Sequence, residues 1–128
     1  MKRIKIGNNY IWAGSLATVN PSIVDVTISL CAKCKGDSIH FYTRNYRAPS
    51  ASAVDYVEDL MLKGKSCAIY CMYGKGRTGT LLALLMARQG VKDPVAEVRK
   101  RYKKNSIESS IQVHAILREV KKYKKLRN

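Results

Sequence analysis

The sequence predicts a single α/β domain over residues 1–128, with a central, mostly parallel sheet of about four to five strands flanked by helices. Its 128 residues fit one domain and can bury a real core. Residues 24–30 form a continuous β-branched run, as a central strand of a parallel sheet requires. Residues 67–70 and 81–87 are an apolar strand and an apolar helix, joined by a glycine-rich turn.

The first half of the chain supplies most of the remaining strands. Residues 2–6 alternate basic and apolar side chains, as an edge strand does, and residues 10–13 return to complete a hairpin. Residues 15–20 are expected to form a helical turn. Residues 39–43 are rich in aromatic and β-branched side chains and predict a third strand after the central one.

Three further helices are predicted around the one at 81–87. Ser50 is a suitable N-cap for residues 51–63, Asp93 with Pro94 starts a helix that ends near residue 101, and a final helix spans about 109–125. The inward faces of the first and last of these are expected to carry Val54, Val57, Leu60 and Met61, and Ile111, Ala115, Leu117 and Val120, respectively.

The turn between the strand at 67–70 and the helix at 81–87 has the properties of an anion-binding site. Gly74, Gly76 and Gly79 allow successive backbone N–H groups to converge on one point. The following helix adds its unpaired N–H groups and the positive end of its dipole. A phosphate dianion can therefore be held there without a metal.

Three side chains in this turn supply chemistry. Cys71 lies at its start, where the positive field favours a nucleophilic thiolate. Arg77 has a planar fork of donors that can hold two phosphate oxygens, and Thr78 is placed to hydrogen-bond the sulfur. Cys71, Arg77 and Thr78 are thus the predicted catalytic residues. The predicted phosphate-binding residues are Met72, Tyr73, Gly74, Lys75, Gly76 and Arg77.

Two other interpretations of the turn are less favourable. A nucleotide-binding Walker loop needs Gly-x-x-x-x-Gly-Lys-Ser/Thr, whereas this chain has the sequence Gly-Lys-Gly-Arg-Thr from residue 74. A buried structural cysteine followed by an ordinary turn is simpler. The Cys-x5-Arg-Thr spacing with internal glycines, set between a strand and a helix, favours the anion site.

The segment from Cys71 to Thr78 resembles the signature loop of the cysteine-dependent protein tyrosine and dual-specificity phosphatases, His-Cys-x-x-Gly-x-x-Arg-Ser/Thr, and is similar to compact archaeal-type members. The family's opening strand looks like residues 10–15, and its second strand looks like residues 24–31. Its closing segment looks like the one that starts at Ile111. The resemblance implies a protein tyrosine phosphatase-like fold. It also implies cysteine-dependent hydrolysis of phosphomonoesters, namely protein phosphotyrosine, phosphoserine or phosphothreonine, through a phosphocysteine intermediate and with no cofactor.

Two positions depart from the family's pattern. Tyr70 stands where a histidine usually precedes the cysteine. Asn45 stands where the usual aspartate general acid would fall, and an amide cannot donate a proton as an acid. Asn45 thus marks the expected position of the general acid. Asp37 is the candidate to supply the proton from a neighbouring position, with Asp55 as a weaker candidate.

These departures leave two alternative functions open. An RNA 5′-triphosphatase or phosphatase of the same superfamily is favoured by Asn45, because a pyrophosphate leaving group departs without an acid more easily than a phenolate. A catalytically weak, phosphate-binding pseudophosphatase is permitted by the loss of both the histidine and the acid. Retention of Cys71 and Arg77 together argues against the second alternative.

Composition restricts the partners. Lysine and arginine number 24 against 9 acidic residues, giving a net charge of +15, which predicts a phosphorylated protein or another phosphate-rich anionic substrate. Nucleic acid is a further partner through a basic surface formed by Lys2, Arg3, Lys5, Lys121, Lys122, Lys124 and Lys125. No apolar run is long enough to span a bilayer and no signal segment is present, so we expect a cytoplasmic monomer.

The four cysteines indicate a reducing compartment. Cys31 and Cys34 form a Cys-x-x-Cys pair, but zinc would need two further ligands and the two histidines are isolated, so no metal is predicted. Because the carboxyl ends of parallel strands meet, Cys31 or Cys34 could form a protective disulfide with Cys71. Cys67 is excluded, since four residues along one strand separate it from Cys71 by about 13 Å.

Overall fold

The computed structural model describes residues 1–127, with side chains through Lys124, and contains one five-stranded sheet in the order β1-β2-β5-β3-β4. The strands are β1 (Lys2–Ile6), β2 (Asn9–Ser15), β3 (Val26–Ser29), β4 (Ile39–His40) and β5 (Cys67–Cys71). β1 pairs antiparallel with β2, and every other pairing is parallel. The α/β class and the mostly parallel sheet of about five strands are confirmed.

The central strand β5 aligns the ends of its two neighbours, β2 and β3. All five of its residues are buried, as its apolar sequence predicts. Ser15 at the end of β2 lies opposite Cys71, and Ser29 at the end of β3 lies opposite Tyr70. The segments that follow β2, β3 and β5 therefore leave the sheet at the same edge, where parallel α/β proteins bind ligands.

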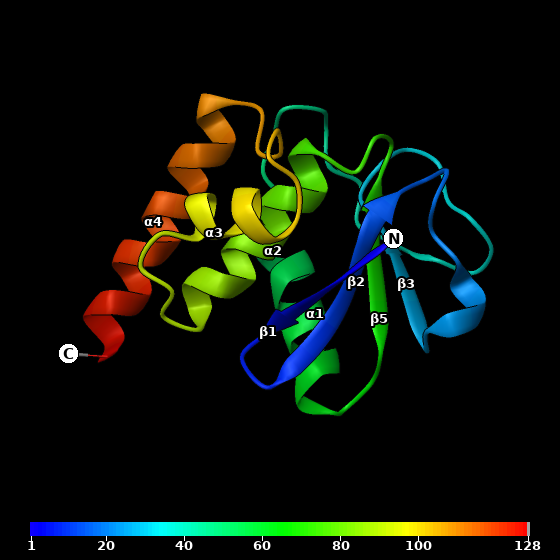
Figure 1. Ribbon diagram of the computed structural model, residues 1–128, viewed down its shortest axis with the longest axis horizontal. Coiled ribbons are helices and arrows are strands. Elements are labelled where there is room, and N and C mark those ends of the chain that lie inside the picture. Colours follow the sequence, from blue (N-terminus) through cyan, green and yellow to red (C-terminus); the bar gives the residue numbers. More distant parts are fainter. Residues whose placement is uncertain (128) are drawn as a thin grey trace.

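The helices are α1 (Ala51–Leu62), α2 (Gly76–Arg88), α3 (Pro94–Arg101) and α4 (Ser110–Arg127), with a short 3-10 turn at Pro21–Ile23. α2 is buried along its whole length and contacts α1, α3, α4 and β5. Figure 1 shows α2, α3 and α4 grouped at one side of the sheet, with α1 crossing behind the strands. The helix that begins at the candidate loop is thus the central helix of the domain.

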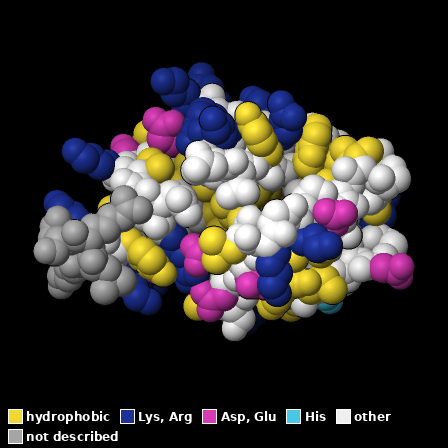
Figure 2. All heavy atoms as spheres, turned by 90° about the horizontal axis from the view of Figure 1, so that it is seen from below, with side chains coloured by type: hydrophobic (Ala, Val, Ile, Leu, Met, Phe, Trp, Pro, Cys, Tyr) yellow, Lys and Arg dark blue, Asp and Glu magenta, His cyan; other side chains and the backbone are white. Residues whose placement is uncertain are grey.

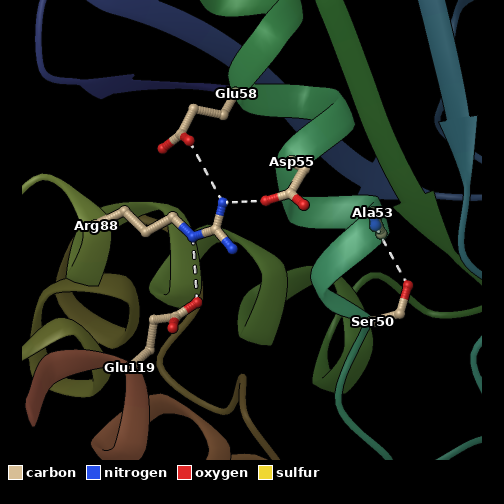
Figure 3. Close-up of polar contacts among 6 residues, drawn as sticks. All are labelled: Ser50, Ala53, Asp55, Glu58, Arg88 and Glu119. Carbon is tan, nitrogen blue, oxygen red and sulfur yellow. Dashed lines mark hydrogen bonds and ion pairs between the residues drawn. The ribbon is translucent and has the colours of Figure 1, made fainter. Parts of the chain in front are cut away.

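Local sequence explains the start of α1. The Ser50 hydroxyl accepts a hydrogen bond from the Ala53 N–H at 3.2 Å (Figure 3), which is the N-cap expected of serine. The predicted stripe of Val54, Val57, Leu60 and Met61 is buried.

Several predicted boundaries differ from the structure. β4 stops at His40, although the Phe41 and Thr43 N–H groups still donate to the carbonyls of Ser29 and Leu30, both at 2.9 Å. The helical turn expected over residues 15–20 is confirmed, by contrast, since the Val19 N–H donates to the Ser15 carbonyl at 2.9 Å. In α4, the predicted inward face is wrong for Ile111 and Leu117, which are exposed, whereas Val120 packs against the core as predicted. Gln112 and Ile116 are the fully buried positions instead.

The surface is dominated by positive charge. On the face drawn in Figure 2, Lys and Arg side chains (dark blue) gather mainly along the upper and left margin and in a smaller group near the centre, with Asp and Glu side chains (magenta) scattered among them. Lys125, which the sequence places in the basic surface, lies outside the described side chains. Of the helices in residues 1–127, none is both long and apolar enough to cross a membrane.

Candidate active site

The candidate loop, residues 72–75, joins the end of β5 to the start of α2. Gly74 has φ of 68°, and a Cβ there would lie 2.7 Å from the backbone carbonyl of Gly14. A Cβ on Gly79 would lie 2.8 Å from the Ser106 Cβ. Both glycines are therefore needed for close approach, Gly74 to the end of β2 and Gly79 to the segment after α3. The loop and the N-terminus of α2 lie at the edge of the sheet where β2 and β5 end, which is where an anion site is expected.

Cys71 and Thr78 are in direct contact within this site. The Thr78 hydroxyl donates to Cys71 Sγ at 3.1 Å, with the Gly14 carbonyl 3.4 Å away as an alternative acceptor. Cys71 is 2% exposed and Thr78 is fully buried. A hydroxyl donor held against a sulfur at this distance can stabilise negative charge on it.

Arg77 lies beside this pair, on the first turn of α2, and is 8% exposed. Its Nη1 donates to the Thr43 carbonyl at 2.9 Å, which ties the loop of residues 44–50 to the start of the helix. Within residues 1–127 no other oxygen accepts from this guanidinium. The rest of its fork is therefore available to bind the oxygens of an anion.

Tyr102, the residue that follows α3, contacts the candidate loop and was not identified by the sequence analysis. Its hydroxyl donates to the Gly74 carbonyl. Burial, and after it the neighbouring Cys71, raise the pKa of Tyr102 well above its ordinary value, so the phenol stays protonated and remains a donor. Lys103 Nζ lies 3.5 Å from the Tyr73 carbonyl, so the two residues that follow α3 contact two successive residues of the loop.

Comparison with known protein families identifies the family of this chain. The model of a protein family described as PTP-SAK, Swiss Army Knife protein, DSP-PTPase phosphatase domain, matches residues 30–125, which is more than half of the chain. The chain belongs to this phosphatase-domain family. The resemblance of the Cys71 segment to the tyrosine and dual-specificity phosphatases is thereby confirmed.

Two curated relatives of this phosphatase domain are uncharacterized proteins of Methanocaldococcus jannaschii. MJ0215 is 33% identical over 72 residues, which are 56% of this chain and 45% of that protein. MJECL20 is 32% identical over 69 residues, 54% of this chain and 47% of that protein. The matched segments thus span about half the length of these relatives.

Solved phosphatase structures share the fold. Tk-PTP in its active form has a TM-score of 0.65 and 24% identity, covering 77% of this chain and 79% of that one. PTPMT1 has a TM-score of 0.69 and 14% identity, covering 91% and 94%. At these identities the similarity shows the fold of the phosphatase domain alone.

Tyr70, which replaces the family's usual histidine, does not contact Cys71. Adjacent residues of a strand point to opposite faces of the sheet. The Tyr70 hydroxyl instead lies 2.6 Å from the Ser38 hydroxyl and accepts from the Lys35 N–H at 2.8 Å. It therefore organises the segment between β3 and β4, on the face away from the sulfur.

Asn45 lies in the loop that Arg77 holds, two residues after Thr43. Its side-chain oxygen accepts from the Tyr46 N–H at 3.0 Å, within a turn closed by the Arg47 N–H on the Arg44 carbonyl at 3.0 Å. Tyr46 has φ of 65° and is 54% exposed. The structure therefore brings the Asn45 loop to the candidate site.

The other two candidate acids lie elsewhere, which corrects both suggestions. Ile39 pairs with Ile28, and Ile28 with Ile69, so Asp37 lies toward the amino ends of the strands. A four-residue offset from Cys71 corresponds to about 13 Å along the sheet. Asp55 pairs with Arg88 at 2.6 Å, at the far end of α2, about 16 Å along the helix axis from Arg77.

The Cys-x-x-Cys pair is free of disulfide bonds, with Cys31 buried and Cys34 exposed. Cys31 Sγ lies 3.6 Å from the Ser29 hydroxyl, and Ser29 is in register with Tyr70 rather than with Cys71. Cys31 Sγ therefore faces away from Cys71 Sγ, and a disulfide between them would require the strand end to rearrange. For Cys34 the pairing with Cys71 stays a prediction. In the described part of the chain, no three His, Cys, Asp or Glu side chains gather closely enough to hold a metal.

Gln112 is a second site residue that the sequence analysis did not single out for a role. Its side-chain oxygen accepts from the N–H groups of Glu108 and Ser109 at 2.7 and 3.2 Å, and its amide donates to the Arg47 carbonyl at 3.1 Å. Its own N–H donates to the Ser109 hydroxyl at 3.1 Å. This is a capping box, and the Ser-x-x-Gln spacing before α4 is the signal that identifies it.

Proposed function

We propose that this phosphatase domain hydrolyses phosphomonoesters on protein phosphotyrosine, phosphoserine and phosphothreonine, with Cys71 as the nucleophile. The observation that supports this most directly is the juxtaposition of Cys71 Sγ, the Thr78 hydroxyl and the buried Arg77 at the start of α2. A sulfur with a hydroxyl donor, next to converging N–H groups and an arginine fork, is suited to attack a bound phosphoryl group.

The reaction runs in two steps. The Cys71 thiolate attacks phosphorus, the sulfur–phosphorus bond forms, and the bond to the leaving oxygen breaks while the loop N–H groups and Arg77 hold the three equatorial oxygens. Water then attacks the phosphocysteine, releasing inorganic phosphate and the thiolate. The Thr78 hydroxyl stabilises the sulfur's charge at the start and at the end of this cycle.

The test is steady-state hydrolysis of para-nitrophenyl phosphate in the presence of a chelator, for the native chain and for Cys71→Ser. We expect turnover in the native chain that the serine variant loses, together with trapping of phosphate on Cys71 in quenched reactions. Turnover that survives in Cys71→Ser would contradict the proposal. Absence of turnover on all phosphoryl substrates would leave a phosphate-binding pseudophosphatase.

A second candidate, hydrolysis of RNA 5′-triphosphate ends, is favoured by Asn45 and by the net charge of +15. A pyrophosphate leaving group needs less protonation than a phenolate. A competition assay with phosphopeptide and 5′-triphosphorylated RNA separates the two, since kcat/KM for RNA would exceed that for the peptide. Because a solved structure of PTPMT1 is a complex with PI(5)P, a phosphoinositide belongs in the same substrate panel.

A further inference from the structure

Glu108 is an acidic residue for which the fold provides no counter-charge. Of the nine acidic residues, seven have polar partners: Asp25, Asp55, Glu58, Asp59, Asp93, Glu97 and Glu119. Among the side chains that the structure describes, those of residues 1–124, the carboxylates of Asp37 and Glu108 are left without one. Asp37 lies toward the amino ends of the strands, whereas Glu108 lies beside the anion-binding loop.

The carboxylate of Glu108 packs directly against the start of α2. A Cβ on Gly76 would lie 2.6 Å from Glu108 Oε1, so the carboxylate lies directly against this glycine. Glu108 is otherwise exposed. The Glu108 carboxylate thus lies at the edge of the anion-binding loop, where a bound ligand can reach it.

The backbone around Glu108 is held rigidly in this place. Ile107 has φ of 64°, which is an outlier for a β-branched residue. The guanidinium of Arg99 donates to the carbonyls of Ser106 and Ile107 at 3.1 and 2.9 Å. On the other side, Gln112 accepts from the Glu108 N–H at 2.7 Å. The strained conformation is therefore enforced from both sides, and it turns Glu108 toward the loop.

The same segment also contacts both parts of the site. The Ile107 N–H donates to the Lys75 carbonyl at 3.4 Å, and the Ser109 hydroxyl donates to the Tyr46 carbonyl at 2.6 Å. Glu108 is thus framed by the anion-binding loop on one side and the Asn45 loop on the other.

We propose that Glu108 is the proton donor of this enzyme, in the role that Asn45 cannot perform; the inference rests on the proposed phosphatase function. A carboxyl group can give a proton to a leaving oxygen, which an amide cannot do. Glu108 lies against the start of α2, beside the loop that would hold the phosphoryl group, whereas Asp37 lies toward the amino ends of the strands.

The proton balance closes over the cycle. As the Cys71 thiolate forms its bond to phosphorus, the leaving oxygen takes the electron pair of the broken bond and the proton of Glu108. The resulting carboxylate then accepts a proton from the water that attacks the phosphocysteine. The products are the alcohol or phenol, inorganic phosphate, the thiolate and the reprotonated Glu108.

The test compares two aryl phosphates that differ in how much they need an acid. Phenyl phosphate releases a phenolate that must be protonated, whereas 2,4-dinitrophenyl phosphate releases a stable anion. For Glu108→Gln we expect kcat/KM on phenyl phosphate to fall about 100-fold or more, with at most a few-fold change on the dinitrophenyl ester. Asp37→Asn is the matched control and should leave both values unchanged.

The outcomes separate the two proposals. Equal losses of Glu108→Gln on both esters, or no loss on either, would overturn the role of Glu108 while the Cys71-dependent reaction stands. If neither ester is turned over in a Cys71-dependent way, the phosphatase proposal fails and the role of Glu108 fails with it. Circular dichroism of each variant confirms that the exposed substitution leaves the fold intact.

Discussion

A single hydroxyl group controls the environment of the sulfur in this site. Thr78 Oγ1 is the hydroxyl donor to Cys71 Sγ, at 3.1 Å, and both residues are buried. Because a hydrogen bond to a charged group is stronger than one to a neutral group, this contact matters most when the sulfur is a thiolate.

We therefore expect Thr78→Val to lower kcat by about 10- to 100-fold, since hydrogen bonds to charged groups contribute about 1.5–3 kcal/mol. Valine keeps the shape of threonine, so substrate affinity should change little. Steady-state kinetics on para-nitrophenyl phosphate measure both parameters.

Thr80→Val is the matched control for this substitution. The Thr80 hydroxyl is also buried on α2, but it donates to the Gly76 carbonyl at 2.6 Å and not to sulfur. If the two variants lost the same activity, the effect of Thr78 would come from the helix and not from the thiolate.

The buried thiol of Cys67 makes the stability of the fold depend on pH. Burial raises the pKa of its thiol from 9.0 to about 12. The thiol ionises more easily in the unfolded chain, so its contribution to stability is fully present below pH 9 and is lost as the pH rises toward 12.

The free energy of unfolding should therefore fall by roughly 1.4 kcal/mol per pH unit above pH 9 from this group. Cys67→Ala should flatten that dependence, whereas substitution of the exposed Cys34 by alanine should not. Urea unfolding at pH 8, 9 and 10 in reductant provides the measurement. Parallel curves for the native chain and Cys67→Ala would contradict the prediction.

At the scale of elements, one arginine joins three helices behind the site. Arg88, the last residue of α2, has a side chain that is 5% exposed. Figure 3 shows its guanidinium directed at Asp55 and Glu58 of α1 and at Glu119 of α4, at 2.6, 3.3 and 3.2 Å. Burial alone would lower the pKa of Arg88, but the hydrogen bonds that its guanidinium donates to Asp55 and Glu119 outweigh burial and raise the pKa, so Arg88 stays charged.

Arg88→Met should destabilise the fold by about 3 kcal/mol, because it leaves partly buried carboxylates without a counter-charge. The same variant should keep its kcat well below the unfolding temperature, since the network lies at the opposite end of α2 from Arg77. Chemical unfolding and activity at one temperature measure the two effects.

Asp59→Asn is the control, since its ion pair with Lys63 is exposed and contributes at most about 1 kcal/mol. Equal losses of stability in Arg88→Met and Asp59→Asn would show that burial of the Arg88 network adds nothing.

At the scale of the whole molecule, the sequence predicts those elements whose structure is determined by residues close together in the chain. The hairpin, the central strands and the Cys71 to Thr78 loop follow from alternation, β-branched runs and glycine spacing. The start of α2 at Gly76 was less predictable, since Gly76 and Gly79 are poor helix formers that are retained for close packing. Local propensity is overridden there by tertiary contact.

The residues that sequence did not identify act across long separations. Tyr102 reaches Gly74, and Glu108 reaches Gly76, only after α3 and a turn with a positive φ at Ile107 have formed. Nothing in the local pattern of residues 102–108 encodes those contacts. The error for Asp37 has a different source, since Asp37 precedes β4, and in a parallel sheet the residues before a strand lie at the amino ends, away from Cys71.

The net charge of +15 acts on association rather than on the fold. A field of this sign attracts anionic substrates, and salt weakens it because the screening length falls from about 10 Å at 0.1 M to about 3 Å at 1 M. We expect kcat/KM for a phosphopeptide with acidic flanks to fall about tenfold over that range of salt, since electrostatic steering changes association rates by 10-fold or more.

A phosphopeptide of the same length with basic flanks is the matched control, and its kcat/KM should rise or stay constant, because salt relieves repulsion. The two slopes against salt separate the field of the protein from any effect of salt on the chemical step, which both peptides share. Identical slopes would mean that the positive charges of the surface do not affect the binding of substrate at the site. The preference for anionic partners predicted from composition would then not apply to this reaction.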